Sequence, residues 1–324
     1  MIDRRTLLGA ALPLLPGLAQ AQGAAWPARN LTMIVPFPPG GQADLAARPV
    51  AAALQRVLGR AVTVENRGGA GGAIGNAAAA RAAPDGYTTL MTLSSVAVLP
   101  EAERIWDRRP SYELNQLAPV ARVLADPTVL ACRGNAPWRN VADLVEDARR
   151  RPDTITYGSS GNYGTTHVCM EQFALAAGVK FRHVPYRGGG PALTGLLTGE
   201  VDLLPGGPGP ARPHVAEGTF RILAGWGRER VPAFPAVPTF IEAGYPEVEF
   251  YIWAGLFTPV GVPEPVMTRL REGMREAMAA PDTRRAFEEA GSPPAYLDTP
   301  EFAHFVEADS ARLIEVVRRI GRVE

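Results

Sequence analysis

Runs of apolar residues with the length of strands alternate with segments that have the periodicity of helices along most of this chain. A strand expected over 31–37 precedes a helix over 43–58, and a strand over 62–65 precedes a helix over 74–82. Such repeated alternation is typical of α/β folds that are built from parallel βαβ units. The sequence therefore predicts an α/β fold, and its 324 residues are enough for two domains.

The same alternation continues towards the C-terminus. Further strands are expected within "DGYTTLMTL" and over 128–132, 156–158, 181–184, 202–204 and 221–224, and further helices over 141–150, 165–177, 191–198, 263–279 and 300–320. In the last helix, Thr299 is expected as the N-cap, Pro300 as the first helical residue and Gly321 as the C-cap. Pro49 lies inside the first helix, where its missing N–H group is expected to kink or delay that helix.

The N-terminus has the pattern of an export signal. Arg4 and Arg5 are followed by an apolar segment over 7–18 and by Ala19-Gln20-Ala21, a small-x-small cleavage pattern. This apolar segment is shorter than a membrane-spanning helix, so residues 1–21 are predicted to be a signal peptide. The two arginines are compatible with the general secretory route and with the twin-arginine route. The remaining chain is expected outside the cytoplasm.

The charges of the chain balance, with 33 lysine and arginine residues against 33 aspartate and glutamate residues. Because the basic residues are spread among acidic neighbours, the sequence predicts no nucleic-acid partner and no anionic-lipid surface. The two cysteines, Cys132 and Cys169, are compatible with a disulfide bond in an oxidising compartment and equally with two buried free thiols.

Four glycine-rich segments each lie between an expected strand and an expected helix: "PFPPGGQAD", "ENRGGAGGAIG", "YGSSGNYGTTH" and "VPYRGGGPA". The first N–H groups of a helix have no partner within the helix, and the helix dipole makes this end favourable for an anion. In open α/β sheets, ligands gather at the carboxyl ends of the strands. These junctions therefore predict an anion site. Asp44 is either a first-turn acid that stabilises its own helix or a ligand contact, and the hydroxyl residues of the third junction are N-caps, ligand donors or both.

Enzyme motifs are near misses in this chain. The segment Gly158-Ser159-Ser160-Gly161-Asn162 does not fit the G-x-S-x-G nucleophile elbow, and no phosphate-binding G-x-x-x-x-G-K-[ST] loop is present. The four histidines are not spaced as metal ligands: His167, His183, His214 and His304. We therefore predict no catalytic residue, no metal and no cofactor. The alternative is an exported hydrolase that uses Ser159 or Ser160, for which the sequence shows no recognisable base and acid.

Six longer stretches carry a family resemblance by their order and spacing: "IVPFPPGGQADLAAR", "VTVENRGGAGGAIGNAAAARAAPDGYTTL", "ITYGSSGNYGTTH", "VPYRGGGPALTGLLTGEVDLL", "RVPAFPAVPTFIEAGYP" and "PVGVPEPVMTRL". With them the chain resembles the solute-binding receptors of tripartite tricarboxylate transporters, the Bug family, along essentially its whole length after the signal. The resemblance implies a type II periplasmic binding protein, with two α/β domains, two interdomain crossings and a ligand cleft. We expect domain 1 over 22–124 and 252–324, and domain 2 over 125–251.

The resemblance also implies a site and a function. Carried over by position, the expected ligand-binding residues are Phe37, Pro39, Gly40, Gly41, Gln42, Ala43, Asp44, Ser159, Ser160, Gly161, Tyr163, Thr165, Thr166, Tyr186 and Gly188. The family implies a periplasmic receptor without enzymatic activity that captures a small organic carboxylate and delivers it to membrane permease subunits. A monomer is expected as the default for a two-domain receptor that must close. A carboxylate sensor that feeds a signalling partner is the alternative.

Two positions depart from the pattern of the family. Tyr163 stands where the family has a smaller arrangement, so we expect it to narrow or line the cleft. Gly206 and Gly207 stand where the family usually has an Asp-Asn-like pair. The ligand preference of relatives therefore does not transfer directly to this chain.

Overall fold

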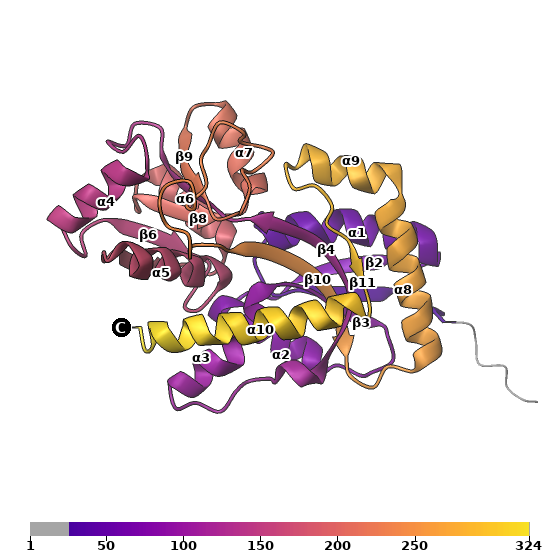
Figure 1. Cartoon of the computed structure of the whole chain (residues 1–324). Coiled ribbons are helices and arrows are strands. Elements are labelled where there is room, and N and C mark those ends of the chain that lie inside the picture. Colours follow the sequence, from indigo (N-terminus) through magenta and orange to yellow (C-terminus); the bar gives the residue numbers. More distant parts are fainter. Residues whose placement is uncertain (1–25, 324) are drawn as a thin grey trace, which may run out of the picture.

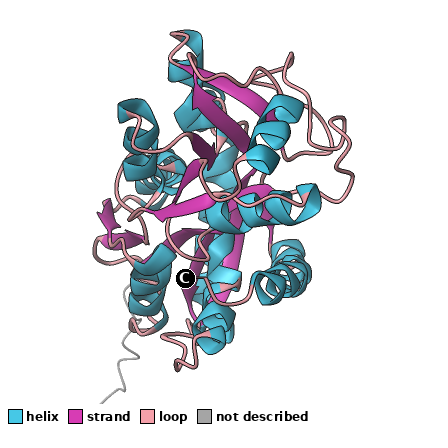
Figure 2. Ribbon diagram, turned by 90° about the vertical axis from the view of Figure 1, so that its left-hand side faces the viewer, coloured by secondary structure: helices cyan, strands magenta, loops and turns pink. Residues whose placement is uncertain are grey.

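A computed structural model describes residues 26–323, which form two β-sheets flanked by helices (Figure 1). The predicted signal peptide lies outside the described residues. Figure 2 shows helices on either side of the strands in both halves of the molecule. None of the helices within residues 26–323 is both long enough and apolar enough to cross a membrane.

The first sheet has the strand order β11-β4-β10-β3-β1-β2. Its strands are β1 (Leu31–Val35), β2 (Val62–Asn66), β3 (Thr88–Leu93), β4 (Leu117–Pro127), β10 (Tyr251–Pro259) and β11 (Leu297–Asp298). Strand β1 is parallel to β2 and β3, whereas β10 is antiparallel to β3 and β4. The sheet is therefore mixed, and the expectation of parallel βαβ units holds only for its β1–β3 half.

Helices cover both faces of this first sheet. They are α1 (Gln42–Leu58), α2 (Ala73–Ala80), α3 (Leu99–Ile105), α8 (Glu264–Ala279), α9 (Pro281–Glu289) and α10 (Glu301–Ile320), with short 3-10 turns η1 (Ala70–Gly72), η2 (Ser94–Ala97) and η3 (Leu114–Gln116). One apolar cluster joins α1 and α8 to the sheet, and another joins α2, α3 and α10 to it. Strands β1 and β10 bury nearly all of their side chains on both faces, and their sequences are nearly continuous apolar runs.

The second sheet has the order β7-β6-β8-β5-β9. Its strands are β5 (Val129–Arg133), β6 (Thr156–Ser159), β7 (Arg182–Pro185), β8 (Leu203–Gly206) and β9 (Phe220–Gly225), and its helices are α4 (Val141–Arg150), α5 (Thr165–Ala177), α6 (Gly189–Thr198) and α7 (Pro208–Ala216). Strand β6 is parallel to β7 and β8, and β5 is antiparallel to β8 and β9. This sheet is mixed as well.

The chain passes between the two sheets twice. Strand β4 ends at Pro127 and β5 begins at Val129, and the chain returns between Gly225 at the end of β9 and Tyr251 at the start of β10. Two α/β units joined by two crossings agree with the predicted fold class. The domain boundaries at 124/125 and 251/252 stay predictions.

Aromatic side chains near the second crossing are packing residues. Trp226 is fully buried, with its ring centroid 4.4 Å from that of Phe240. Phe240 in turn lies 4.4 Å from Phe173 of α5. Trp253 of β10 is also buried, and its indole N–H donates to Asp309 over 2.7 Å. Both tryptophans are therefore packing residues.

Three local expectations need correction or completion. Pro49 does not delay its helix, because α1 begins at Gln42 and contains Pro49. Thr299 is not the N-cap of α10: the cap is Pro300, and the Thr299 hydroxyl contacts the carbonyl oxygens of Pro119 (3.1 Å) and Val120 (2.7 Å) in β4. The two cysteines are both buried and unpaired among the described residues.

Candidate functional site

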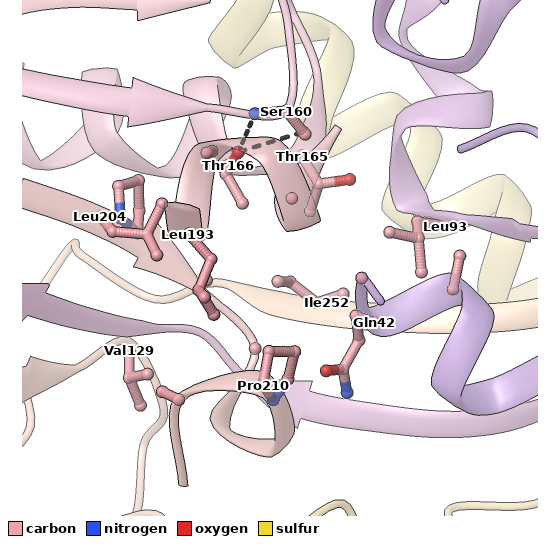
Figure 3. A pocket seen from close by; sticks show the side chains of 18 of the residues that line it. Gln42, Leu93, Val129, Ser160, Thr165, Thr166, Leu193, Leu204, Pro210 and Ile252 are labelled. Carbon is pink, nitrogen blue, oxygen red and sulfur yellow. Dashed lines mark hydrogen bonds between the residues drawn. The ribbon is translucent and has the colours of Figure 1, made fainter. Parts of the chain in front are cut away.

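A small cavity of about 50 Å³ lies between the two sheets (Figure 3). Seven of the expected site residues line it: Phe37, Gly41, Gln42, Ala43, Ser160, Thr165 and Thr166. They come from the segment that leads into α1 and from the segment between β6 and α5. The structure thus brings together, in one cavity, two segments that are more than a hundred residues apart in the sequence.

Helix N-termini from both halves meet at this cavity. Gly41 is the N-cap of α1, Gly164 that of α5 and Gly188 that of α6. A Cβ atom on Gly41 would lie 3.6 Å from the amide nitrogen of Gly190, so the starts of α1 and α6 are in direct contact. The first N–H groups of each helix have no intrahelical acceptor, and their dipoles favour an anion. The arrangement therefore offers several backbone donors to one anionic group.

Glycines allow the two halves to approach this closely. A Cβ atom on Gly190 would lie 2.8 Å from the carbonyl oxygen of Pro39, and one on Gly188 would lie 2.7 Å from Cδ of Pro38. Pro39, Gly40 and Gly188 do not themselves line the cavity. They form the contact between the α1 and α6 loops that closes it.

Hydroxyl groups line the cavity at the start of α5. The Thr166 hydroxyl accepts a hydrogen bond from the Ser160 amide (2.8 Å) and donates to the Ser160 hydroxyl (3.0 Å). The Thr165 hydroxyl accepts from the Ser94 hydroxyl over 3.3 Å. Ser160 and Thr165 therefore each retain a hydroxyl proton that can be donated to a ligand.

Asp44 has a structural environment. Its carboxylate is buried and accepts hydrogen bonds from the Gly40 amide (3.1 Å), from Arg48 (2.9 Å) and from Asn66 (3.1 Å). Burial raises its pKa, but these hydrogen bonds outweigh that effect and leave the pKa lowered. Asp44 does not line the cavity, which favours the interpretation of a first-turn acid that stabilises α1 and its loop.

Gln42 is held by two residues that the sequence did not single out. Its amide nitrogen donates to the Asp126 carboxyl group and, over 2.9 Å, to the Ser292 hydroxyl. Burial raises the pKa of Asp126 to about 7. The amide oxygen of Gln42 is buried and has no hydrogen-bond partner in the described part of the chain. A glutamine in a glycine-rich turn gave no local signal for these contacts, because both partners are far away in the sequence.

The structure provides a base for Ser159 but no access to it. The Ser159 hydroxyl lies 2.6 Å from Nε2 of His183, whose ring stacks on that of His167 at 4.1 Å. Ser159 is completely buried and does not line the cavity, and none of the hydrogen bonds within residues 26–323 joins a carboxylate to His183. Ser160 does line the cavity, but its side-chain partner is Thr166. Neither serine has the arrangement of a hydrolase nucleophile.

Tyr163, Gly161 and Tyr186 line a different groove, of about 450 Å³, on the side of η1 and α3. Tyr163 is buried, and its backbone adopts a positive φ of 54°. Its hydroxyl accepts from the Trp106 indole (3.1 Å) and from the Val323 amide (3.2 Å), and it donates to the Gly321 carbonyl (2.7 Å). Tyr163 therefore neither narrows nor lines the small cavity. It joins the second half to the chain end beyond α10.

Sequence reasoning missed most of the apolar lining. The remaining walls include Leu93, Val129, Ala131, Ala192, Leu193, Leu204, Pro210, Ala211 and Ile252, together with Gly206 and Gly207. The junction "PGGPGP" before α7 has the same strand-glycine-helix form as the four segments used for the prediction, and this signal was available. Across residues 26–323, no group of three or more histidine, cysteine, aspartate and glutamate residues is arranged to hold a metal ion.

Comparison with known proteins places the chain in a family. The model of the tripartite tricarboxylate transporter family receptor matches residues 46–322. Protein BugT of Bordetella pertussis is 34% identical over 307 residues, which cover 94% of this chain and 93% of BugT. Solved structures agree: periplasmic binding protein BugD superposes with a TM-score of 0.85 at 30% identity, covering 91% of this chain and 99% of that one.

Two further solved structures of similar proteins contain ligands. MatC from Rhodopseudomonas palustris with bound malate has a TM-score of 0.83 at 29% identity, covering 90% of this chain and 100% of that one. Rpa4515 from R. palustris with adipate has a TM-score of 0.83 at 30% identity, covering 90% and 97%. The fold class of a two-domain periplasmic binding protein is thereby confirmed. The chain belongs to the tripartite tricarboxylate transporter receptor family, the Bug proteins, which are solute-binding receptors and not enzymes.

Proposed function

We propose that this chain is a monomeric periplasmic receptor that binds a small organic carboxylate in the cavity between its two sheets and delivers it to membrane permease subunits. The observation that carries the proposal is the meeting of the N-termini of α1, α5 and α6 at a cavity whose described lining contains no charged side chain. Free amides and helix dipoles bind an anion without an arginine or lysine.

The family supports the rest of the proposal. Similar proteins hold malate and adipate, both of which are carboxylates. The matched family is the receptor component of a tripartite transporter, and BugD is a periplasmic binding protein. The export pattern at the N-terminus supports the periplasmic location. Contacts from both sheets to one anion would favour the closed arrangement, which the permease would then recognise.

The test is a thermal-unfolding screen of the purified protein with organic acids and with the amide of each acid. We expect at least one acid to raise the unfolding midpoint in a concentration-dependent way, because a ligand at 100 times its Kd stabilises the folded state by about 2.7 kcal/mol. The matching amide should have no effect, since it lacks the negative charge. Equal shifts for acid and amide, or no shift with any acid, would contradict carboxylate binding.

A further inference from the structure

The lining of the cavity is divided into a donor end and an apolar end. Its polar side chains are Gln42, Ser160, Thr165 and Thr166. In the view of Figure 3, Leu193, Leu204 and Val129 gather on the left, away from Thr165, Gln42 and Leu93 on the right. The following inference rests on the proposed function and concerns which carboxylates fit such a cavity.

The donor end can hold one carboxylate. The donors there are the first-turn amides of α1 and α5 and the free hydroxyl protons of Ser160 and Thr165. The start of α6 touches the start of α1 near Gly41 and therefore contributes to the same end. A carboxylate has two oxygen atoms with about four acceptor positions, which this set of donors can satisfy.

The α7 helix adds few donors to the opposite side. Its first residue is Pro208 and its third is Pro210, so two of its first three residues have no N–H group. The start of α7 lies against Gln42, because the space of a Cβ atom on Gly207 is taken by the Gln42 side chain. The amide nitrogen of Gln42 already donates to Asp126 and to Ser292, so the Gln42 side chain has no donor left for a second carboxylate. A second anionic group therefore finds no counterpart at α7.

The apolar end belongs to the hydrophobic core of the second sheet. Val129 and Ala131 of β5, Ala192 of α6, Leu204 of β8 and Ala211 of α7 are all buried members of one apolar cluster. An ionised carboxylate placed against these side chains would lose its hydration without gaining hydrogen bonds, which costs several kcal/mol. A hydrocarbon tail would instead gain from burial.

The size of the cavity limits the length of the tail. A cavity needs a volume of about 10 to 15 Å³ to hold one water molecule. The volume of this cavity is about 50 Å³. A cavity this small favours a short ligand over a long one. We infer that the ligand carries a single carboxylate, bound at the donor end, and a short uncharged apolar tail against Leu193, Leu204 and Val129, as in butyrate. Dicarboxylates such as succinate are excluded.

Isothermal titration calorimetry with the purified protein tests this directly. Across acetate, propionate and butyrate we expect each added methylene group to tighten Kd by about fourfold, the effect of burying one such group. Succinate, which has the same number of carbon atoms as butyrate but a second charge, should not bind measurably. Butyramide, which keeps the tail without the charge, should not bind either.

A pair of variants locates the tail. Leu193 of α6 lines the cavity, and Leu197, one turn further along the same helix, does not. We expect Leu193→Ala to weaken butyrate binding about tenfold and to leave acetate binding unchanged, because only the longer acid reaches this side chain. The matched variant Leu197→Ala should leave both affinities unchanged.

The outcomes separate this inference from the proposed function. If succinate or a longer dicarboxylate binds and butyrate does not, the single-carboxylate inference is overturned while carboxylate capture stands. Equal weakening of acetate and butyrate by Leu193→Ala would also overturn the placement of the tail. If butyramide binds as well as butyrate, or if neither mono- nor dicarboxylates bind, the proposed function itself fails.

Discussion

Individual residues at this site act through the space and the donors that they leave free. Gly190 and Gly188 are needed because a Cβ atom would meet the backbone or ring of the opposite loop. Gly41 differs from them, since its φ of −91° suits any residue and a Cβ atom would make ordinary contact with Gly190 at 3.6 Å. Gly41 therefore leaves free the space beyond the position that a Cβ atom would occupy.

This difference gives a graded prediction for Gly41. We expect Gly41→Ala to keep ligand affinity within about threefold, because one methyl group fits. Gly41→Val adds two methyl groups that point at the start of α6, so the loops cannot close and affinity should fall more than about tenfold. Calorimetry with the acid that gives the largest thermal shift measures both. Undiminished affinity of the valine variant, in a protein with a normal unfolding midpoint, would argue against this site.

At the scale of elements, a stack of rings supports the junction between β6 and α5. The ring centroid of His183 in β7 lies 4.9 Å from that of Tyr157 in β6 and 4.1 Å from that of His167 in α5, and the Tyr157 and His167 centroids are 6.4 Å apart. His183 also contacts the Ser159 hydroxyl, and Nδ1 of His167 accepts a hydrogen bond from the Tyr163 amide over 3.0 Å. Burial lowers the pKa of both imidazole rings and so disfavours their charged forms. The junction that presents Ser160 and Thr165 to the cavity is therefore sensitive to acid.

The pH dependence of the free energy of unfolding should reveal the burial of His183. Burial lowers the pKa of His183 from 6.5 to about 4, so between these values the unfolded chain binds a proton that the folded chain does not. We expect the free energy of unfolding to fall as the pH falls through this window, by about 2 kcal/mol at pH 5 for His183 alone. Urea unfolding at a series of pH values from 7 to about 4 measures the slope.

The His183→Gln variant separates the contribution of His183 from those of groups that change stability with pH in the opposite direction. Burial raises the pKa of Asp126 to about 7 and also raises the pKa of Glu171, so both carboxyl groups contribute stability that is lost as the pH rises. His167, whose pKa is lowered well below 6.5 by burial, acts in the same direction as His183. The difference between the wild-type and His183→Gln curves cancels the contributions of the two carboxyl groups and reports His183 together with its effect on the pKa of His167. Parallel curves for the two proteins would contradict the assignment to His183.

At the scale of the whole molecule, the two halves meet on two sides. The loops of α1 and α6 touch over the cavity, and η1 touches the β6–α5 loop, where a Cβ atom on Gly161 would lie 3.0 Å from the Gly71 amide nitrogen. On this second side the Tyr163 hydroxyl is bonded to Trp106 and to the chain end after α10. Figure 1 shows α10 running beneath the second half, with the C-terminus below α5. These contacts join the two halves, and we expect them to break when the halves separate.

Removing the hydroxyl should weaken closure and, with it, ligand binding. We expect Tyr163→Phe to lower ligand affinity about threefold to tenfold, although Tyr163 does not line the cavity, because net losses of about 0.5 to 1.5 kcal/mol accompany broken hydrogen bonds. Calorimetry gives the affinity, and small-angle X-ray scattering of the ligand-free protein should give a larger radius of gyration. Tyr87→Phe is the matched control, since the Tyr87 hydroxyl contacts the Ala28 amide within the first half. Identical ligand affinities for Tyr163→Phe and Tyr87→Phe would contradict a role of the Tyr163 hydroxyl in holding the two halves together.

Much of the fold could be predicted from local sequence patterns, and the exceptions have physical reasons. The helix expected over 165–177 has those bounds in the structure, and those expected over 43–58 and 263–279 each begin within one residue of their predicted start. The long strands β4 and β10 were not expected. Pro119 interrupts the apolar run of β4 and lies beside a register shift in its pairing with Phe257, and β10 is preceded by a proline-rich segment. These strands are stabilised mainly by pairing with each other across more than a hundred residues, and a local pattern does not record such pairing.

The sequence by itself determined the α/β class, the glycine-rich helix starts and the family, because strand and helix periods and motif order are properties of neighbouring residues. It also named the cavity residues Gly41, Gln42, Ser160 and Thr165, since the first residues of a helix carry amides without an intrahelical acceptor. The hydroxyl residues are not the N-cap of α5, which is Gly164. Only the tertiary structure decided that Asp44 and Tyr163 face away from the cavity and that β5, α6 and α7 supply its apolar end. These choices depend on which elements pack together in three dimensions, and side chains distant in sequence then determine the charge and size of the ligand that fits.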